Sequence, residues 1–285
     1  MEFPKILDTI GNTPIVHLSK TFEFNQPAIL AKLEFFAPGG SVKDRLALAM
    51  VEDAEQRGIL KTGGTIVECS SGNSGIGLAM VAAVKGYRAI IVMADKNSKE
   101  KQDIIKAFGA EVVLTPHEVL PEHPDSNYST TERLSKEIEG AVHLDQFNNP
   151  ANTEVHYSAT AKEIWEQTEG EIEFIYAGIG TGGTLSGIAK YLKEKNPEIK
   201  AFGVDIEGSV FSDLFYKGTM SEPKQYKIEG IGGDNAPDNT RFEYYDELIM
   251  VSDRESFRAV NNLCRAEGIF AGGSSGSAVA AISKS

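Results

Sequence analysis

The sequence alternates between two hydrophobic periodicities along most of its length, and this alternation limits the folds open to it. Short runs rich in β-branched residues, such as TIVEC (65–69) and RAIIVM (88–93), have the length and composition of buried strands. Segments such as SKEKQDIIKAFG (98–109) place apolar residues on one helix face and end at glycine. Strands that alternate with helices through short links predict parallel sheets covered by helices.

This alternation occurs twice, so the sequence predicts two α/β lobes with a cleft between them. We expect each lobe to be a mostly parallel twisted sheet flanked by helices. The remaining strands are predicted at 111–115, 173–178, 200–205 and 247–253, and the remaining helices at 76–86, 130–140, 153–170, after the glycines of 180–183, and at 254–268.

Composition excludes several classes of function. The chain has 41 acidic and 28 basic residues, a formal net charge of −13, whereas nucleic acids and anionic membranes require a basic surface. Two cysteines, Cys69 and Cys264, form no disulfide framework, and the five histidines form no pair with metal-ligand spacing. The N-terminus lacks the regions of a signal peptide. We expect a cytoplasmic protein with no metal ion, no nucleic-acid partner and no membrane association.

Three glycine-rich segments are predicted to follow strands and open helices: SSGNSG (70–75), GIGTGGT (178–184) and AGGSSGS (271–277). Such a turn directs backbone N–H groups and the positive end of a helix toward an anion. None has the Gly-Lys-Ser/Thr ending of a P-loop. One turn alone is a weak signal, because Gly–Gly turns also form for backbone reasons.

A fourth segment, PGGSVKDRLALAM (38–50), places Lys43 in the first turn of a predicted helix, with Ser41 as the N-cap. The helix dipole disfavours a lysine there. One interpretation is a tolerated surface lysine. The other is an amine whose pKa is lowered by the helix end, which favours the neutral form needed for a Schiff base.

Taken together, PGGSVKDR, SSGNSG, GIGTGGT and GGSSGSA occur in an order that resembles the β-family, fold type II, of pyridoxal-phosphate (PLP) enzymes. That family contains cysteine synthase and cystathionine β-synthase. The resemblance extends from Ile10 to Ala281, and the set is specific although no single motif is. Further matches are IGNTP (10–14), DQF and NPAN (145–152), EIWEQT (163–168) and EGIG (229–232).

The resemblance implies PLP as the cofactor and a role for each motif. Lys43 would form the internal aldimine and, once freed, act as the base at the substrate Cα. Asn73 would donate a hydrogen bond to the 3′ oxygen of the cofactor. The phosphate would be held at a helix N-terminus by Gly180, Thr181, Gly182, Gly183 and Thr184. The substrate carboxylate would be received by Ser70, Ser71, Gly72, Asn73 and Ser74, assisted by Gln146.

The resemblance also implies that Ser274 faces the pyridine nitrogen. A neutral hydroxyl does not keep the ring protonated, so the ring is a weaker electron sink and loss of a β leaving group competes well. The expected reaction is β-replacement or β-elimination on serine, O-acetylserine or cysteine through an aminoacrylate, in cysteine and hydrogen sulfide metabolism.

The same resemblance assigns residues 1–40 and 146–285 to a larger cofactor-binding lobe and 41–145 to a smaller, mobile lobe that carries the substrate loop. It also implies a homodimer. The haem-binding extension of animal cystathionine β-synthases is absent, so we expect no haem, and the chain ends before the family's usual C-terminus.

Some residues keep a structural alternative. Asn73, Ser74 and Thr181 also suit turns and helix caps, and Gln146 suits a buried polar contact. Asp234 suits an Asx turn. Alternatively, its carboxylate orients an amino group of a thiol substrate, or polarises a water, which would convert cysteine to serine and hydrogen sulfide. Cys69 is expected to be a buried small hydrophobe.

Two other functions remain open at this point. A serine/threonine dehydratase or a diaminopropionate-type synthase shares the scaffold. A non-catalytic PLP-fold partner protein is the alternative from another class, since a fold can be kept when its chemistry is lost.

Overall fold

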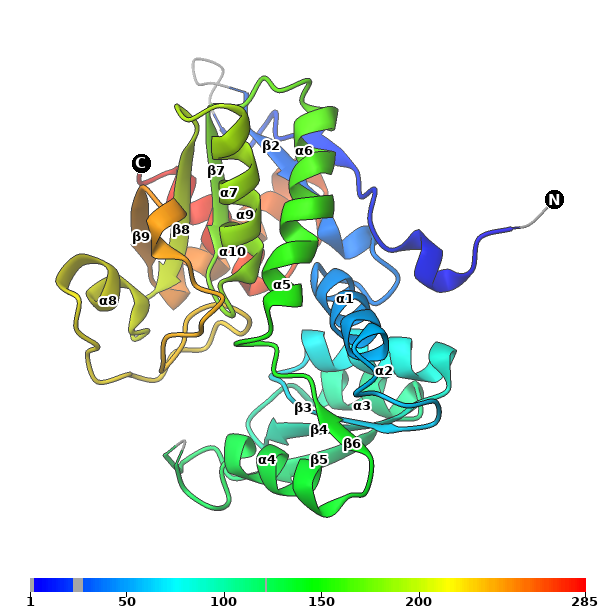
Figure 1. Ribbon diagram of the computed structural model, residues 1–285. Coiled ribbons are helices and arrows are strands. Elements are labelled where there is room, and N and C mark those ends of the chain that lie inside the picture. The colour runs from blue at the N-terminus through cyan, green and yellow to red at the C-terminus, as the bar shows by residue number, and fades with distance from the viewer. Residues whose placement is uncertain (1–2, 23–27, 121) are drawn as a thin grey trace. The chain divides into compact units, whose positions relative to one another are not determined.

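The computed structural model describes residues 3–22, 28–120 and 122–285. The chain forms two compact units, shown in Figure 1. Unit 1 consists of Met1–Asn12 and Glu34–Ala151, and unit 2 of Thr13–Leu33 and Asn152–Ser285. Within the described residues, no helix combines the length and the apolar composition that crossing a bilayer requires.

These boundaries differ from the sequence-based ones, which grouped the first twelve residues, 34–40 and 146–151 with the larger lobe. Local contacts explain the difference. Glu34 forms an ion pair with Arg45, and the segment after residue 145 is hydrogen-bonded back to the carbonyl of Leu144. No change of composition marks either junction.

Unit 1 is a parallel sheet with helices on both faces. Its strands are β3 (Thr65–Cys69), β4 (Arg88–Ala94), β5 (Glu111–Thr115) and β6 (Ala141–His143), and its helices are η1 (Ile6–Thr9), η2 (Glu34–Phe36), α1 (Lys43–Gln56), α2 (Asn73–Lys85), α3 (Lys99–Ala107) and α4 (Asn127–Glu137). The strand order is β5-β4-β3-β6, and every pair is parallel. Figure 1 shows α4 on one face, α2 and α3 on the other, and α1 against α2.

The local sequence explains the centre of unit 1. All five residues of β3 are buried, as expected for a central strand of a parallel sheet. Helix α2 is apolar around most of its circumference, because β4 and β3 lie on one side of it and α1 on another. It ends at Gly86, which adopts the left-handed conformation of a C-terminal cap.

Unit 2 contains a second parallel sheet and a short antiparallel ribbon. Its strands are β1 (Ile15–His17), β2 (Leu30–Lys32), β7 (Phe174–Gly178), β8 (Lys200–Ile206) and β9 (Glu247–Val251), and its helices are α5 (Pro150–Val155), which begins in unit 1, η3 (His156–Thr160), α6 (Ala161–Gln167), α7 (Gly183–Lys195), α8 (Phe211–Lys217), η4 (Phe242–Tyr244), α9 (Asp253–Glu267) and α10 (Gly273–Ile282). The parallel sheet has the order β7-β8-β9, and β1 pairs with β2.

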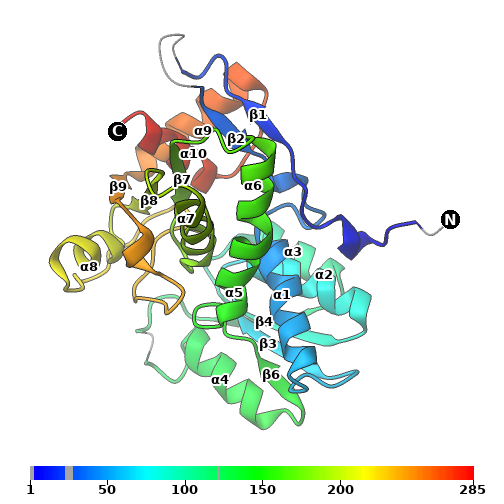
Figure 2. The ribbon, with the colours of Figure 1, turned by 45° about the horizontal axis from the view of Figure 1, so that its top comes forward.

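Helices cover both faces of the β7-β8-β9 sheet. Helix α7 lies on one face, and α10, backed by α9, lies on the other, as Figures 1 and 2 show. The β1–β2 ribbon contributes Leu18 and Leu33 to an apolar cluster completed by Leu263, Ile269 and Val279. The α/β class and the two mostly parallel sheets flanked by helices are confirmed.

Several local predictions differ from the structure. The helix predicted over 153–170 contains one π turn, η3, which the sequence periodicity did not reveal. The segment AGGSSGS follows helix α9 rather than a strand, and most of it lies inside α10. The strand predicted to reach residue 253 ends at Val251, because Ser252 caps α9 with its side chain. The short strands β1 and β2 and helix α8 were not predicted.

Candidate active site

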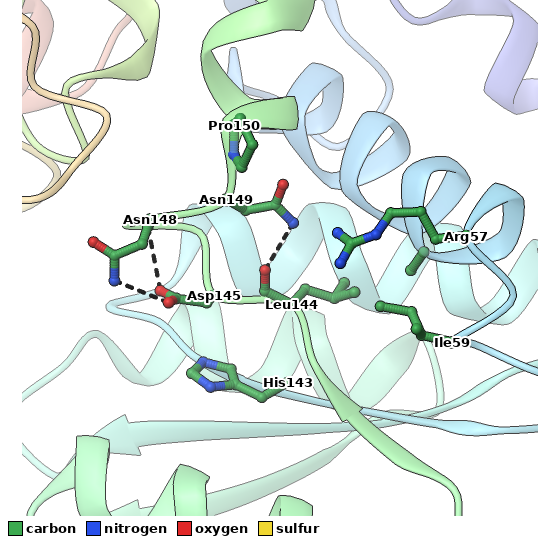
Figure 3. A pocket seen from close by; sticks show the side chains of 9 residues that line it. Arg57, Ile59, His143, Leu144, Asp145, Asn148, Asn149 and Pro150 are labelled. Atoms are coloured by element: carbon green, nitrogen blue, oxygen red, sulfur yellow. Dashed lines mark hydrogen bonds between the residues drawn. The ribbon is translucent and has the colours of Figure 1, made fainter.

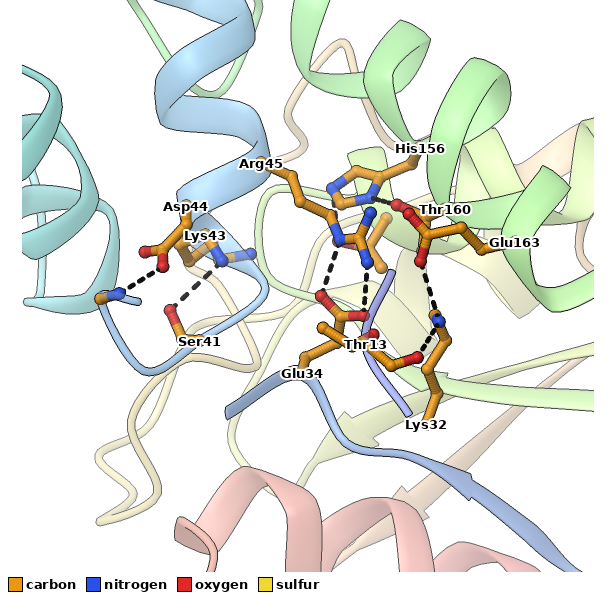
Figure 4. Close-up of polar contacts among 12 residues, drawn as sticks. Thr13, Lys32, Glu34, Ser41, Lys43, Asp44, Arg45, His156, Thr160 and Glu163 are labelled. Carbon is orange, nitrogen blue, oxygen red and sulfur yellow. Dashed lines mark hydrogen bonds and ion pairs between the residues drawn. The ribbon is translucent and has the colours of Figure 1, made fainter. Parts of the chain in front are cut away.

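Lys43 is the first residue of α1 and follows the turn that precedes this helix (Figure 4). Its backbone N–H donates to the Ser41 hydroxyl over 3.2 Å, and Val42 holds the N-cap position that the sequence assigned to Ser41. Although Lys43 keeps some exposure, burial lowers the pKa of its amine to about 8. The sequence attributed a lowered pKa to the helix end, whereas desolvation of the ammonium is the cause here.

Side chains that follow Lys43 fix this turn (Figure 4). Buried Asp44 accepts a hydrogen bond from the Gly39 N–H over 2.6 Å, and Arg45 forms two bonds to Glu34, of 2.8 and 2.9 Å. A Cβ on Gly39 would lie 2.4 Å from a carboxylate oxygen of Asp44, so this position requires glycine. Burial raises the pKa of Asp44 to about 6. The backbone that presents the Lys43 amine is therefore held by buried polar contacts.

The loop before α2 is held by its own first serine. The buried Ser70 hydroxyl accepts hydrogen bonds from the N–H groups of Gly72 and Gly75, each over 3.0 Å. Gly72 is the N-cap residue with φ 145°, a conformation that L side chains rarely adopt. Because these two N–H groups already have an acceptor, the first turn can present those of Asn73 and Ser74 to an anion.

Gln146 lies against this loop and is 3% exposed. Its Oε1 accepts from the Ser74 hydroxyl over 2.5 Å, and its Nε2 donates to the Cys69 carbonyl over 2.6 Å. The structure therefore brings together Ser74 and Gln146, which the sequence assigned to one carboxylate site. Cys69 itself is a buried free thiol, as expected.

The glycines of the loop before α7 have close neighbours inside unit 2. A Cβ on Gly180 would lie 2.8 Å from the Gly230 carbonyl oxygen. On Gly182 it would lie 2.2 Å from the Thr240 hydroxyl oxygen and 2.5 Å from the Thr240 Cα. The sequence explained these glycines by the approach of a phosphate, and the structure adds a steric reason within the protein itself.

Two residues of the preceding helical segment contact threonines of this loop. Asn152 Nδ2 donates to Thr181 Oγ1 over 2.9 Å, and His156 Nε2 lies 3.1 Å from Thr184 Oγ1. His156 belongs to the π turn, where its Nδ1 lies 2.9 Å from Thr160 Oγ1 (Figure 4). His156 lies in the segment 153–170 that the sequence predicted as a helix, and the sequence gave Asn152 no role. The one feature of the sequence that pointed to Asn152 is that it is the last residue of the NPAN motif.

The N-terminus of α7 suits a phosphate group. Its N-cap residue, Gly182, has no side chain to accept a bond from the first turn, so the N–H groups of Gly183, Thr184 and Leu185 lack helical acceptors. The buried Thr240 Oγ1 beside Gly182 makes no hydrogen bond within the described chain. A phosphate dianion accepts several such bonds and is favoured by the positive helix end. The residues present therefore fit the phosphate of PLP, and the amine of Lys43 fits its aldehyde.

The two remaining predicted site residues lie in unit 2. Ser274 is partly buried in the first turn of α10, with its Oγ 3.9 Å from the position that a Cβ on Gly230 would take. Asp234 is exposed in the bend that follows EGIG. Burial raises the pKa of Tyr226 to about 12, and the charge of Asp234 adds to this rise. The structure places Ser274 beside the EGIG segment and leaves Asp234 accessible.

Among curated proteins, the chain is 46% identical to a cystathionine beta-synthase of Apis mellifera over 284 residues, which is 99% of this chain and 56% of that protein. It is 46% identical to a cystathionine beta-synthase of Mus musculus over 283 residues, 99% of this chain and 50% of that protein. The chain spans about half the length of the curated relatives it matches.

Among solved structures, O-ureido-L-serine synthase superposes with a TM-score of 0.88 at 38% identity, covering 98% of this chain and 85% of that one. A lysine-to-alanine variant of that enzyme, bound to O-ureido-L-serine, gives a TM-score of 0.89 at 37% identity over 99% of this chain and 85% of that one. The family model described as "Pyridoxal-phosphate dependent enzyme" matches residues 6–285. With this match over almost its whole length, the chain belongs to the family of pyridoxal-phosphate dependent enzymes, in their fold type II.

Proposed function

We propose that this chain catalyses PLP-dependent β-replacement on a serine-type amino acid. The observation that carries the proposal is the Lys43 amine, whose pKa burial lowers to about 8 on a turn fixed by Asp44. An amine that is partly neutral near physiological pH can hold the cofactor's aldehyde and later exchange a proton.

When bound, the cofactor supplies an aldehyde carbon and an electron-withdrawing ring. The protein's residues then divide the remaining tasks. Lys43 Nζ moves the proton at the substrate Cα. The first turn of α2, with Asn73 and Ser74, binds the substrate carboxylate, and Gln146 holds Ser74 in place. The first turn of α7 binds the phosphate.

Ser274 completes this assignment as the hydroxyl partner of the ring nitrogen. A serine does not stabilise a positive charge on the ring as a carboxylate would, so less electron density is drawn away from Cα. Departure of the β-substituent then competes well with proton return. This is the selectivity that a β-replacement enzyme requires.

The names of the relatives support the choice of reaction. Cystathionine and O-ureido-L-serine are both three-carbon amino acids with a substituent attached to Cβ, through sulfur in the first and through oxygen in the second. We therefore propose serine, O-acetylserine or cysteine as the donor, and sulfide, homocysteine or water as the acceptor. Hydrogen sulfide would be consumed when sulfide is the acceptor and released when cysteine is the donor.

A donor-by-acceptor activity matrix with the purified protein tests this proposal. A band near roughly 410 nm that shifts on addition of serine or cysteine is expected from a lysine-bound cofactor. Borohydride reduction followed by peptide mapping should place the adduct on Lys43. Keto acid and ammonia from serine or threonine alone would instead indicate a dehydratase, and a band that no amino acid shifts would indicate a non-catalytic protein.

The variant Lys43→Ala should lose about a thousandfold or more in turnover, because no other amine can replace this one at the cofactor. Lys136→Ala is the matched control, since Lys136 is an exposed lysine paired with Glu132 on α4. Normal turnover of Lys43→Ala, with the adduct on another lysine, would contradict the proposal.

Asp234 is proposed to act on the acceptor side, by orienting an amino group of a thiol acceptor or by polarising a water. Its exposure leaves it free to meet an incoming molecule. The Asp234→Asn variant should change the ratio of serine to thioether products made from cysteine. An unchanged ratio and rate would remove this role and leave the rest of the proposal intact.

We further propose that the protein works as a homodimer in the cytoplasm. The resemblance to the PLP family supports the first statement, and the acidic, cysteine-poor composition supports the second. Light scattering of the eluting protein should give about twice the 30.8 kDa chain mass. A monomeric mass with full activity would exclude the dimer.

A further inference from the structure

Glu68 is a carboxylate in the core of unit 1 that the proposed chemistry does not use. It lies in β3, between β4 and β6, and is 0% exposed. A carboxylate in this position is costly to desolvate, so burial raises the pKa of Glu68. Its Oε2 has no hydrogen-bond partner in the described chain. Because a buried charge of this kind adds little to stability, we expect another role for the Glu68 carboxylate.

His143, at the end of β6, is the partner of this carboxylate. Its Nε2 lies 3.4 Å from Glu68 Oε1, and its side chain is 30% exposed, whereas that of Glu68 is fully buried. His143 lines a pocket of about 230 Å³ together with Arg57, Asp145 and Asn148 (Figure 3). The histidine therefore reaches both the buried carboxylate and the solvent, so a proton can enter or leave the pair through this pocket.

The pair is connected to the loop before α2. Glu68 Oε1 accepts from the Cys69 N–H over 3.2 Å, and the Glu68 carboxylate also accepts from the backbone N–H of Gln146. The Gln146 side chain in turn joins the Cys69 carbonyl to the Ser74 hydroxyl. A continuous series of contacts therefore runs from His143 through Glu68 and Gln146 to the first turn of α2.

We propose that Glu68 and His143 are a positioning pair for the substrate-carboxylate loop. While the pair holds a proton, Glu68 fixes the backbone N–H groups of Cys69 and Gln146. The Gln146 side chain then keeps Ser74 in place for the carboxylate of an amino acid. This inference rests on the proposed function, because it takes the first turn of α2 as the carboxylate-binding element.

The charges around the pair set its response to pH. Burial lowers the pKa of His143, but its bond to Glu68, together with the charges of Glu68, Asp145 and Glu132 on α4, outweighs burial and raises that pKa overall. Asp145 also adds to the raised pKa of Glu68. The pair is therefore protonated below the raised pKa of His143. As pH rises through that value, His143 becomes neutral and leaves Glu68 buried without a cation, so the loop is expected to loosen on the alkaline side.

The test is a titration of the holoenzyme with the donor, followed by the cofactor's absorbance over pH 6 to 9, roughly the range in which histidine titrates. Wild type should bind the donor more weakly as pH rises. Glu68→Gln should weaken binding about tenfold at neutral pH, because the buried charge that pairs with His143 is lost. It should also abolish the histidine-linked part of the pH dependence. Arg88→Gln, which removes the exposed Arg88–Glu111 pair of the same sheet, is the matched control and should change neither.

Histidine NMR provides a readout independent of turnover. The His143 resonance should titrate above the ordinary histidine range in wild type and should return toward it in Glu68→Gln. If Glu68→Gln does not fold, His143→Gln carries the same test, because its side chain is partly exposed and should lose the same alkaline limb.

The positioning pair would be overturned if the folded variants kept the donor affinity and the pH dependence of wild type, or if His143 titrated in Glu68→Gln as it does in wild type. Failure of the proposed function has a different signature. In that case wild type would show no β-replacement with any donor and acceptor, while its donor-binding titration and NMR would still report on the pair.

Discussion

The two glycine-rich strand–helix turns of this protein are held in different ways. The turn before α2, in unit 1, is held by hydrogen bonds, since Ser70 binds two backbone N–H groups and Gln146 spans Cys69 and Ser74. The turn before α7, in unit 2, has hydrogen bonds with Asn152 and His156 as well, but it adds close contact with backbone, since Thr240 leaves no room for a side chain on Gly182.

The difference shows that glycine-rich turns of similar composition can be held in place by different interactions. Hydrogen bonds can be exchanged with water or ligand at modest net cost, whereas steric contact cannot be relieved without moving backbone. Unit 1 also carries ionisable groups in the helix and strands next to its turns, namely Asp44, Glu68 and His143. We therefore expect the turns of unit 1 to respond to pH and to hydrogen-bond deletion, and that of unit 2 to respond to added volume.

The largest effect is expected from Gly182→Ala, which should destabilise the protein by about 3 kcal/mol or more, because overpacking adds to an unfavourable φ of 83°. Gly86→Ala separates the two causes, since Gly86 has a similar φ of 79° but nothing within 4 Å of its Cβ position. That control should lose only about 1 kcal/mol. Equal losses in urea unfolding would show that backbone conformation, not contact, governs the turn.

Next in size is the pH response of Asp44. Its folded pKa of about 6 lies above the ordinary 3.8, so its carboxyl binds a proton more tightly in the folded state. It therefore contributes stability at low pH that is lost as pH rises from about 4 to 6, by about 2 to 3 kcal/mol. Asp44→Asn should remove this part of the slope when unfolding free energies are compared across that range. If the unfolding free energies of wild type and Asp44→Asn change with pH in parallel, Asp44 does not titrate with a raised pKa in the folded protein.

A smaller loss, about 2 kcal/mol, is expected for Ser70→Ala, because two buried N–H groups lose their acceptor. The neighbouring Ser71 is exposed, and Ser71→Ala should stay within about 0.5 kcal/mol of wild type. Chemical denaturation of the three proteins measures both values. If the two variants are equally stable, the turn of unit 1 does not depend on its first hydroxyl.

The smallest effect is expected for Thr240→Val, which should change stability by less than about 0.5 kcal/mol, because the Thr240 hydroxyl makes no hydrogen bond within the described chain. Cofactor dissociation should nevertheless become faster if this hydroxyl helps to hold the phosphate. Thr181→Val, which removes the partner of Asn152 Nδ2, should cost about 1 kcal/mol. A destabilised Thr240→Val would show that the Thr240 hydroxyl itself supports this turn.

The sequence predicted the parts of the fold that depend on local periodicity. The buried strand TIVEC and helix α2 with its glycine end were identified because burial on both faces leaves a continuous apolar run. Strands β1 and β2 were missed because three residues are too few to show alternation. The π turn at His156 was missed because one extra residue in a turn hardly changes the helical spacing of apolar residues.

The candidate site was predictable from its motifs but not from its contacts. Lys43 was identified by its turn, whereas the cause of its lowered pKa is burial, which depends on residues distant in sequence. Asn152 and Thr240 were missed because their neighbours in the phosphate loop are 29 and 58 positions away. Glu68 was missed because a single acidic residue in a strand pattern does not reveal its partner. Such pairings arise only once the chain has folded.

Unit 1 interrupts the chain of unit 2, and this has a consequence for biosynthesis. The β1–β2 ribbon is synthesised before the segment Glu34–Ala151, yet its apolar partners Leu263, Ile269 and Val279 are synthesised only after that segment. The backbone N–H groups of Lys20 and Thr21 likewise wait for Glu267. The segment Glu34–Ala151 can acquire its own core in the meantime, since domains form as units during synthesis. Nascent protein should therefore contain an ordered insert between two ends of an unfinished domain, and that early ribbon is where a chaperone would be needed longest.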